Sequence, residues 1–139
     1  MNHMPVLIVE DDAVVALDLE LAVIDYGLQD VRTCKSVKDA DREITLRAPK
    51  VAIIDVTMDC GTQSAEVAGR LIQLDCHVIL LANFKEDIRK LPPSLGCCDV
   101  IEKPFRDADL RAKLERVADL GLARATSLDV APNIEIGTG

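Results

Sequence analysis

The feature that most constrains this chain is a run of apolar residues, 51–54, that ends in the single carboxylate of Asp55. The run is rich in β-branched residues and follows Pro49, a pattern typical of a fully buried parallel strand rather than a helix. The carboxyl ends of parallel strands form the edge at which open α/β folds bind ligands. Asp55 is therefore predicted to lie at a ligand-binding edge of a sheet.

A second apolar run, residues 6–9, also ends in acids, namely Glu10, Asp11 and Asp12. If the two strands are neighbours about 4.8 Å apart, at least three carboxylates converge there. Two carboxylates about 5 Å apart repel by roughly 3 kcal/mol at an effective dielectric of about 20, so a cation is expected between them. Mg²⁺ suits such a site, because it takes a few carboxylate oxygens and keeps water or phosphate as its other ligands. Asp12 is better placed to cap the following helix.

Five apolar segments alternate with five helical segments along the chain. The predicted strands cover residues 5–9, 31–34, 51–55, 77–82 and the surroundings of 100–101. The predicted helices run from Asp12 to Gly27, over 36–46, from Ser64, over 85–91, and from Asp107 to about Arg124. This order predicts an α/β fold, a doubly wound five-stranded parallel sheet with helices on both faces. Residues 1–4 are an N-terminal extension, 5–124 the domain, and 125–139 a flexible tail.

Helical spacing also predicts which side chains face the core. In the first helix the predicted apolar stripe is Val14, Leu17, Leu21 and Ile24, broadened by Leu19 and Val23. In the last helix it is Leu110, Leu114, Val117 and Leu120. Residues three and four apart share one face of a helix, so each set would bury a single stripe.

Composition excludes several functions. The formal charge of −8 argues against direct binding to nucleic acid or to an anionic membrane. Apolar runs are of strand length, so no segment is expected to span a bilayer. The five cysteines include no Cys-x-x-Cys pair, which favours buried thiols in a reducing cytoplasm over disulfides or a zinc site.

Lys103 follows the predicted fifth strand, in the sequence Lys103-Pro104-Phe105. Its ammonium would join the acids at the same edge of the sheet and could clamp an anion near Asp55. A carboxylate, a divalent ion and a lysine are the parts needed for phosphoryl transfer to an aspartate.

Three motifs together resemble the receiver domain of two-component response regulators: residues 6–12, Asp55 at the end of its strand, and Lys103-Pro104-Phe105. The resemblance covers roughly residues 5–124. It implies a flavodoxin-like fold with strand order 2-1-3-4-5 and a cis Lys103–Pro104 bond. It also implies Mg²⁺ held by Glu10, Asp11, Asp55 and the main-chain carbonyl of Thr57, with Lys103 contacting the phosphoryl group.

The same resemblance implies partners and a role. Asp55 would be phosphorylated by the phosphohistidine of a histidine kinase or a histidine phosphotransfer protein, in a cytoplasmic phosphorelay. The protein would be a phosphoprotein that signals by protein contact, not an enzyme acting on other substrates. A downstream protein target is implied but not identified, and a homodimer stays open.

The sequence departs from the family pattern mainly at positions that, in the family, change conformation on phosphorylation. The aspartate that accepts the phosphoryl group in the family is present. Ala82 stands where the family has a threonine or serine, Val100 replaces the family's aromatic, and Asp59 replaces a proline. Pro92-Pro93 shortens the fourth predicted helix. Phe84, two residues beyond Ala82, lies where the family controls water access to the phosphoryl group.

Three functions are therefore open. The first is a stand-alone phosphoacceptor; the chain leaves no room for a DNA-binding domain, although residues 126–139 could begin a linker in a longer protein. The second is a pseudo-receiver, an interaction module that does not switch by phosphorylation, which Ala82 favours. The third is an aspartate-based phosphatase, which the missing Asp-x-Asp signature after the first strand disfavours.

Overall fold

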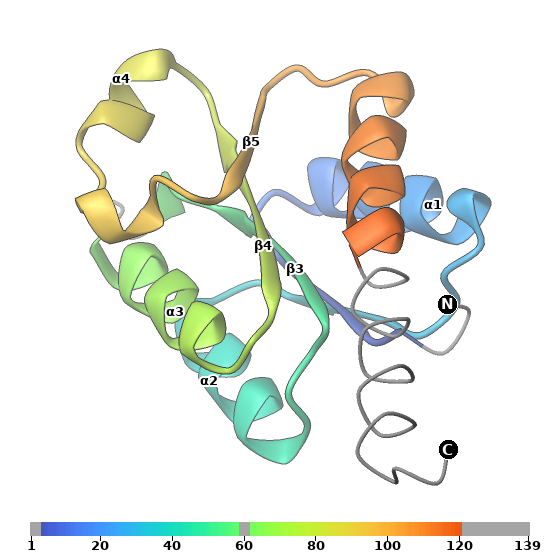
Figure 1. The fold of residues 1–139 in the computed structure, drawn as a ribbon, viewed down its shortest axis with the longest axis horizontal. Helices are drawn as coiled ribbons and strands as arrows, with labels where there is room; N and C mark the ends of the chain where they lie inside the picture. The colour runs from blue at the N-terminus through green and yellow to red at the C-terminus, as the bar shows by residue number, and fades with distance from the viewer. Residues whose placement is uncertain (1–3, 59–61, 121–139) are drawn as a thin grey trace, which may run out of the picture.

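The computed structural model describes residues 4–58 and 62–120, which form one five-stranded parallel sheet covered by helices (Figure 1). The strands are β1 Val6–Val9, β2 Val31–Cys34, β3 Val51–Asp55, β4 His77–Ala82 and β5 Asp99–Glu102. The helices are α1 Ala13–Tyr26, α2 Val37–Leu46, α3 Thr62–Gln73, α4 Lys85–Arg89 and the 3₁₀ turn η2 Pro93–Leu95. A last helix runs over residues 107–120.

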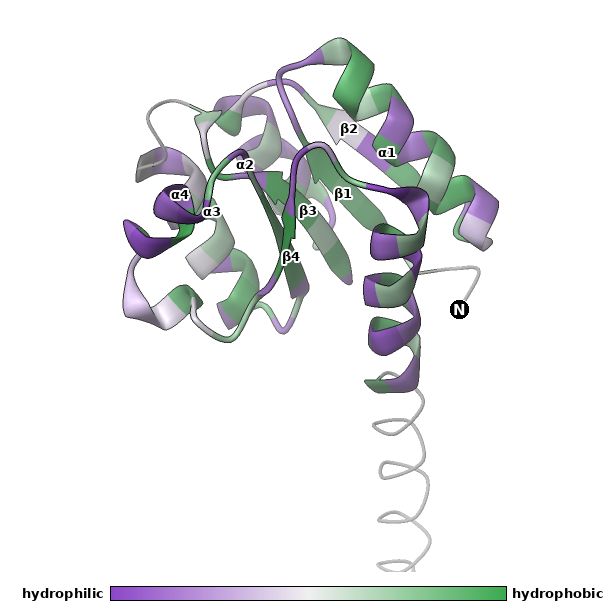
Figure 2. Ribbon diagram, turned by 90° about the horizontal axis from the view of Figure 1, so that it is seen from above, coloured by the Kyte–Doolittle hydropathy of each residue, from purple (hydrophilic) through white to green (hydrophobic). Residues whose placement is uncertain are grey.

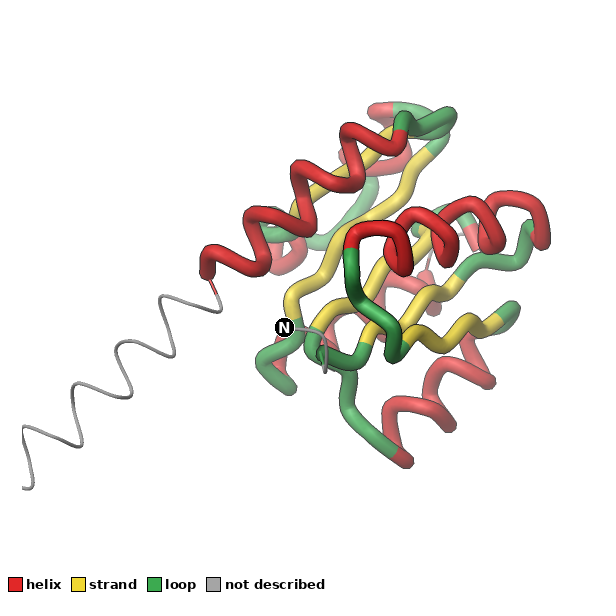
Figure 3. Tube along the Cα trace, turned by 90° about the vertical axis from the view of Figure 1, so that its right-hand side faces the viewer, coloured by secondary structure: helices red, strands yellow, loops and turns green. Residues whose placement is uncertain are grey.

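The strand order is β2-β1-β3-β4-β5, as predicted. The parallel strands lie side by side in Figure 3, with helices on either side of them. α1 and the last helix cover one face, while α2 and α3 cover the other (Figure 1). Side chains alternate between the two faces along each strand, so Val6 and Ile8 pack under α1 and Leu7 and Val9 pack under α2.

The helix ends follow the predicted capping chemistry. Asp12 caps α1, because its Oδ1 accepts the backbone N–H groups of Val14 at 2.9 Å and Val15 at 3.2 Å. Gly27 ends α1 in the left-handed conformation, with φ 117°. Ser36 caps α2, its Oγ accepting from the Asp39 N–H at 3.1 Å. These contacts confirm three of the predicted helix boundaries.

Two predicted boundaries are wrong. α3 begins at Thr62, and Ser64, predicted to cap it, lies inside the helix, where its buried Oγ donates to the Met58 carbonyl at 3.3 Å. α4 ends at Arg89 instead of Leu91. Pro92 lacks a backbone N–H and disfavours helical conformation in the residue before it, which limits α4 to five residues.

Of the six residues predicted to form the core stripe of α1, only Leu19 and Val23 are buried. Val14, Leu17, Leu21 and Ile24 are 41–70% exposed, whereas Ala16, Leu19 and Val23 are buried. α1 is apolar on more than one face, and Figure 2 shows hydrophobic segments on its outer side. The face with the small Ala16 packs against the sheet, because a small side chain lets the helix approach closely. Helical spacing alone could not predict which of the apolar faces would be buried. In the last helix Leu110, Leu114 and Val117 are buried as predicted, but Leu120 is exposed.

Some predictions lie outside the described residues: Asp59 in the loop after β3, most of the N-terminal extension, and the tail 125–139. Within the described part of the chain, no helix is long and apolar enough to cross a membrane.

Candidate functional site

Strand register and side-chain alternation bring three charged residues together at the carboxyl edge of the sheet. Val9 of β1 pairs with Ile54 of β3, so the next residues, Glu10 and Asp55, lie side by side. Lys103 follows β5, and its N–H donates to the Ala82 carbonyl at the end of β4 at 2.8 Å. Each charged residue stands two positions beyond an isoleucine of the core under α1, namely Ile8, Ile53 and Ile101. The alternation of strands therefore directs all three side chains to the same side of the sheet.

The Lys103 ammonium bridges the two buried carboxylates. Its Nζ lies 2.5 Å from Glu10 Oε1 and 2.9 Å from Asp55 Oδ2. The second oxygen of Asp55, Oδ1, accepts the Thr57 N–H at 2.8 Å and the Thr57 hydroxyl at 2.6 Å. Both oxygens of Asp55 are thus held in fixed positions by donors from the segment after β5 and from the loop after β3.

Burial and hydrogen bonding together separate the pKa values of the two carboxyl groups. Desolvation, together with the nearby Asp55, raises the pKa of Glu10 to about 8, although Lys103 opposes the shift. Burial would also raise the pKa of Asp55, but hydrogen bonding with Glu10, Thr57 and Lys103 outweighs it and lowers this pKa to about 2. Of the two groups, Glu10 therefore binds a proton more readily and Asp55 is the stronger acid.

The same hydrogen bonds raise the pKa of Lys103, against the effect of its burial. The lysine is therefore positively charged across the physiological range. An ionised carboxylate held beside a fixed cation is an arrangement suited to attack on an anionic phosphoryl group.

The acid cluster can also hold a divalent cation. Glu10, Asp11 and Asp55 each offer a carboxylate oxygen within 4.8 Å of the others. Glu10 is completely buried, yet its Oε2 has no hydrogen-bond partner among the described residues. Buried polar atoms are normally satisfied, and a bound cation would satisfy this one. Oxygen-only donors of this kind suit Mg²⁺.

A sequence model of the response regulator receiver domain matches residues 6–115. This range includes the acids Glu10, Asp11 and Asp55 and the lysine Lys103. The chain belongs to the response regulator receiver domains. This assignment confirms the predicted family, and the observed strand order confirms the predicted flavodoxin-like fold. No curated protein sequence matches the chain.

Solved structures of two receiver domains and of a two-component transcriptional regulator share this fold. The BeF3-activated DrrB receiver domain is 21% identical with a TM-score of 0.71, and the match covers 84% of this chain and 98% of that one. A CheY-like receiver domain from Methylobacillus flagellatus is 22% identical with a TM-score of 0.70, covering 83% and 98%. A two-component transcriptional regulator AraC from Clostridium phytofermentans is 18% identical with a TM-score of 0.74, covering 89% and 98%.

The positions predicted to modulate the receiver lie around the site with different exposure. Ala82 is fully buried among the apolar side chains under α2 and α3 and offers no hydroxyl. Val100 is partly buried against the same core. Phe84 is 65% exposed and lines a groove of about 420 Å³ that also contains Lys103 and Phe105. The Lys103–Pro104 bond is cis, as the resemblance implied.

The hydroxyl of Thr57 is a site contact that the sequence prediction missed, because only its carbonyl was assigned a role. An aspartate two residues before a threonine is a recognisable signal, since aspartate side chains commonly accept from the backbone two residues on. Here that turn fixes Oδ1 of Asp55 by two donors at once.

Proposed function

We propose that this receiver accepts a phosphoryl group on Asp55 from the phosphohistidine of a histidine kinase or histidine phosphotransfer protein, with Mg²⁺, and signals by protein contact. The observation that carries this proposal is the ionised Asp55 beside Lys103, with the second buried carboxyl of Glu10 close by. The described residues contain the acceptor, its counter-charge and the oxygen ligands for a cation.

The proposed step is a displacement at phosphorus. A carboxylate oxygen of Asp55 forms the new O–P bond while the P–N bond of the phosphohistidine breaks, and the electron pair returns to the imidazole nitrogen. Lys103 lies on the Oδ2 side of Asp55 and would contact the oxygens of the transferred group. Thr57 holds Oδ1 from the other side, which limits rotation of the carboxylate.

Glu10, Asp11, Asp55 and the main-chain carbonyl of Thr57 would hold Mg²⁺. Bound Mg²⁺ supplies charge neutralisation for the oxygens of the transferring group. Glu10 must release its proton to serve as a ligand, because metal ligands act in their deprotonated forms.

The direct test is to treat the full chain with Mg²⁺ and phosphoramidate, a small donor with a P–N bond. We expect one acyl phosphate per chain, sensitive to hydroxylamine and located on Asp55 by peptide mass spectrometry. Chelation of Mg²⁺ before addition of the donor is the control, and it should prevent the reaction. No adduct at saturating donor and metal would contradict the proposal and favour a pseudo-receiver.

The pseudo-receiver is the second candidate, and a specific observation favours it. Ala82 is buried, has no polar side-chain atom and lies at the end of β4, next to the backbone of Lys103. A phosphoryl group on Asp55 would find no hydroxyl at this position. The chain could then accept the group without the hydroxyl-based rearrangement that the family uses.

Phe84 is expected to prolong the phosphorylated state. Its ring borders the groove beside Lys103, where it would exclude the water that hydrolyses an acyl phosphate. We expect Phe84→Glu to shorten the lifetime of the acyl phosphate by about tenfold or more, because a carboxylate there can position and activate water. The measurement is the rate of phosphate release after the donor is removed. Phe84→Leu keeps an apolar side chain and should behave as the parent; equal lifetimes for all three proteins would reject the shielding role.

We further propose that the protein acts in the cytoplasm, promotes only its own phosphorylation and dephosphorylation, and binds neither nucleic acid nor membrane. The net charge of −8 supports the last part, because it opposes association with polyanions. Its output would be a contact with a downstream protein target, with or without formation of a homodimer.

A further inference from the structure

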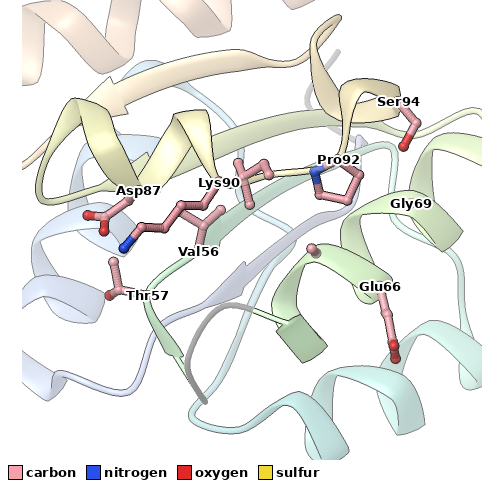
Figure 4. A pocket seen from close by; sticks show the side chains of 10 residues that line it. Val56, Thr57, Glu66, Gly69, Asp87, Lys90, Pro92 and Ser94 are labelled. Atoms are coloured by element: carbon pink, nitrogen blue, oxygen red, sulfur yellow. The ribbon is translucent and has the colours of Figure 1, made fainter.

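A second cavity is lined in part by Thr57, the residue that donates to Asp55 Oδ1. It has a volume of about 850 Å³ and lies between the end of β3, α3, and the segment from α4 to Ser94 (Figure 4). The cavity exists because α4 stops at Arg89 and Pro92 turns the chain toward η2. Its volume falls within the range of small-molecule sites, about 300–1,000 Å³.

The wall of this α3–α4 cavity is about half apolar and half polar. Val56, Ala65, Leu91 and Pro92 line it, and Gly69 of α3 forms part of its floor. A Cβ atom added at Gly69 would meet no heavy atom within 4 Å. No close packing therefore requires glycine here, although glycine inside a helix is unfavourable relative to alanine. Its one evident effect is to leave the floor of the cavity open.

One end of the cavity carries an unpaired positive charge. Among the described residues Lys90 has no ion pair or side-chain hydrogen bond, and Figure 4 shows its ammonium directed toward Thr57 and Asp87. Asp87 accepts the Phe84 N–H at 3.0 Å, so its carboxylate is engaged in starting α4. Glu66 lies away from Lys90, at the opposite end of the cavity (Figure 4). An anionic group of a ligand would thus meet Lys90 first.

From these features we infer that the α3–α4 cavity binds a small molecule with an apolar body and a single anionic group, which pairs with Lys90. The body would lie over Gly69 against Val56 and Leu91. The net charge of −8 and the presence of Glu66 and Asp87 disfavour a polyanion such as a nucleotide. This site goes beyond phosphoryl acceptance by Asp55 and does not depend on it.

The test uses anilinonaphthalene sulfonate, an aromatic monoanion whose fluorescence rises in apolar surroundings, added to the full chain without Mg²⁺ or phosphodonor. We expect saturable binding of one equivalent. Lys90→Glu, which removes the counter-charge, and Gly69→Phe, which fills the cavity, should each weaken binding by about tenfold or more.

Matched controls separate the cavity from other surfaces. Lys85→Glu makes the same charge change on α4 outside the cavity lining, and Leu17→Ser removes part of the exposed apolar stripe of α1; both should bind as the parent does. Circular dichroism verifies folding, and Lys90→Glu alone suffices if Gly69→Phe does not fold.

The inference is overturned if the parent shows no saturable binding, or if folded Lys90→Glu binds as tightly as the parent. It is equally overturned if Leu17→Ser abolishes the signal, because the probe would then be bound at α1. Since the measurement contains no phosphodonor, its failure leaves phosphorylation of Asp55 untouched.

Discussion

The Asp55→Asn protein is expected to form no acyl phosphate under conditions in which the parent is fully modified. The amide lacks the ionised oxygen that attacks phosphorus, and no other described carboxylate has the same position between Lys103 and Thr57. The measurement is incorporation of phosphate after treatment with phosphoramidate and Mg²⁺, followed by intact-protein mass spectrometry.

Asp12→Asn is the matched control for this change. It replaces a carboxylate by an amide in the loop after β1, but Asp12 caps α1 and stands outside the acid cluster. Asparagine caps a helix as well as aspartate does, so this variant should fold and be phosphorylated like the parent. Phosphorylation of Asp55→Asn at another residue would place the acceptor elsewhere and refute the assignment.

Without Mg²⁺, Glu10 is expected to make the stability of the protein fall as pH rises. The pKa of Glu10 is 4.5 in the unfolded chain and about 8 in the folded protein. Between these values the folded state holds a proton that the unfolded state has lost, so the free energy of unfolding decreases with pH over this window. The shift corresponds to a loss of about 5 kcal/mol by pH 8 and above.

Asp55 acts in the opposite direction and at lower pH. Its pKa is lowered to about 2 from 3.8, so its contribution to stability is complete above the unfolded value and is lost as the pH falls through the folded one. The pH ranges in which the two groups change the stability do not overlap, because Asp55 acts below about pH 4 and Glu10 acts above pH 4.5. The decline from pH 4.5 to 8 therefore reports Glu10.

Glu10→Gln tests this dependence, because glutamine has a similar shape and no proton to lose. We expect chemical denaturation to show similar stability for parent and variant at about pH 5, and a more stable variant at about pH 8.5, by roughly 5 kcal/mol. Saturating Mg²⁺ should narrow the difference at the higher pH by stabilising the parent, while adding little to the variant. Glu20→Gln, at a half-buried position of α1 outside the acid cluster, is the control that should leave the pH profile unchanged. A parent profile that is flat between these pH values would show that Glu10 titrates normally.

Most of the fold and the grouping of Glu10, Asp55 and Lys103 could be predicted from sequence, because both depend on features that are local to each strand. An apolar run ending in a charge gives a buried strand and places its last residue at the sheet edge, and this held for Glu10, Asp55 and Lys103. The capping residues Asp12 and Ser36 act within one helical turn, so their roles were also readable. The separation of the two pKa values required the structure, since it depends on distances across three strands.

The failures concern choices that only packing decides. α1 has apolar residues on more than one face, and the sheet selected the face with Ala16 over the larger stripe with Leu17 and Leu21. The α3–α4 cavity depends on how far the segment at Pro92 lies from Gly69. This distance cannot be predicted from the hydrophobic periodicity of the sequence. The one sequence signal for this cavity was Gly69, a glycine in the interior of a predicted helix, where alanine would be more favourable.

The shortness of α4 has a consequence for the equilibrium between formed and unformed states of this segment. A helix of five residues does not persist in water on its own, and none of the residues of α4 is buried. Its order depends on the contact between Asp87 and the Phe84 N–H and on partial packing of Ile88 and Leu91 against the core. Segments of this kind open at a small fraction of the global unfolding free energy. Part of the binding free energy of any partner or ligand that requires the formed α4 is therefore used to order this helix. The apparent affinity of that partner or ligand depends on the fraction of molecules in which α4 is formed.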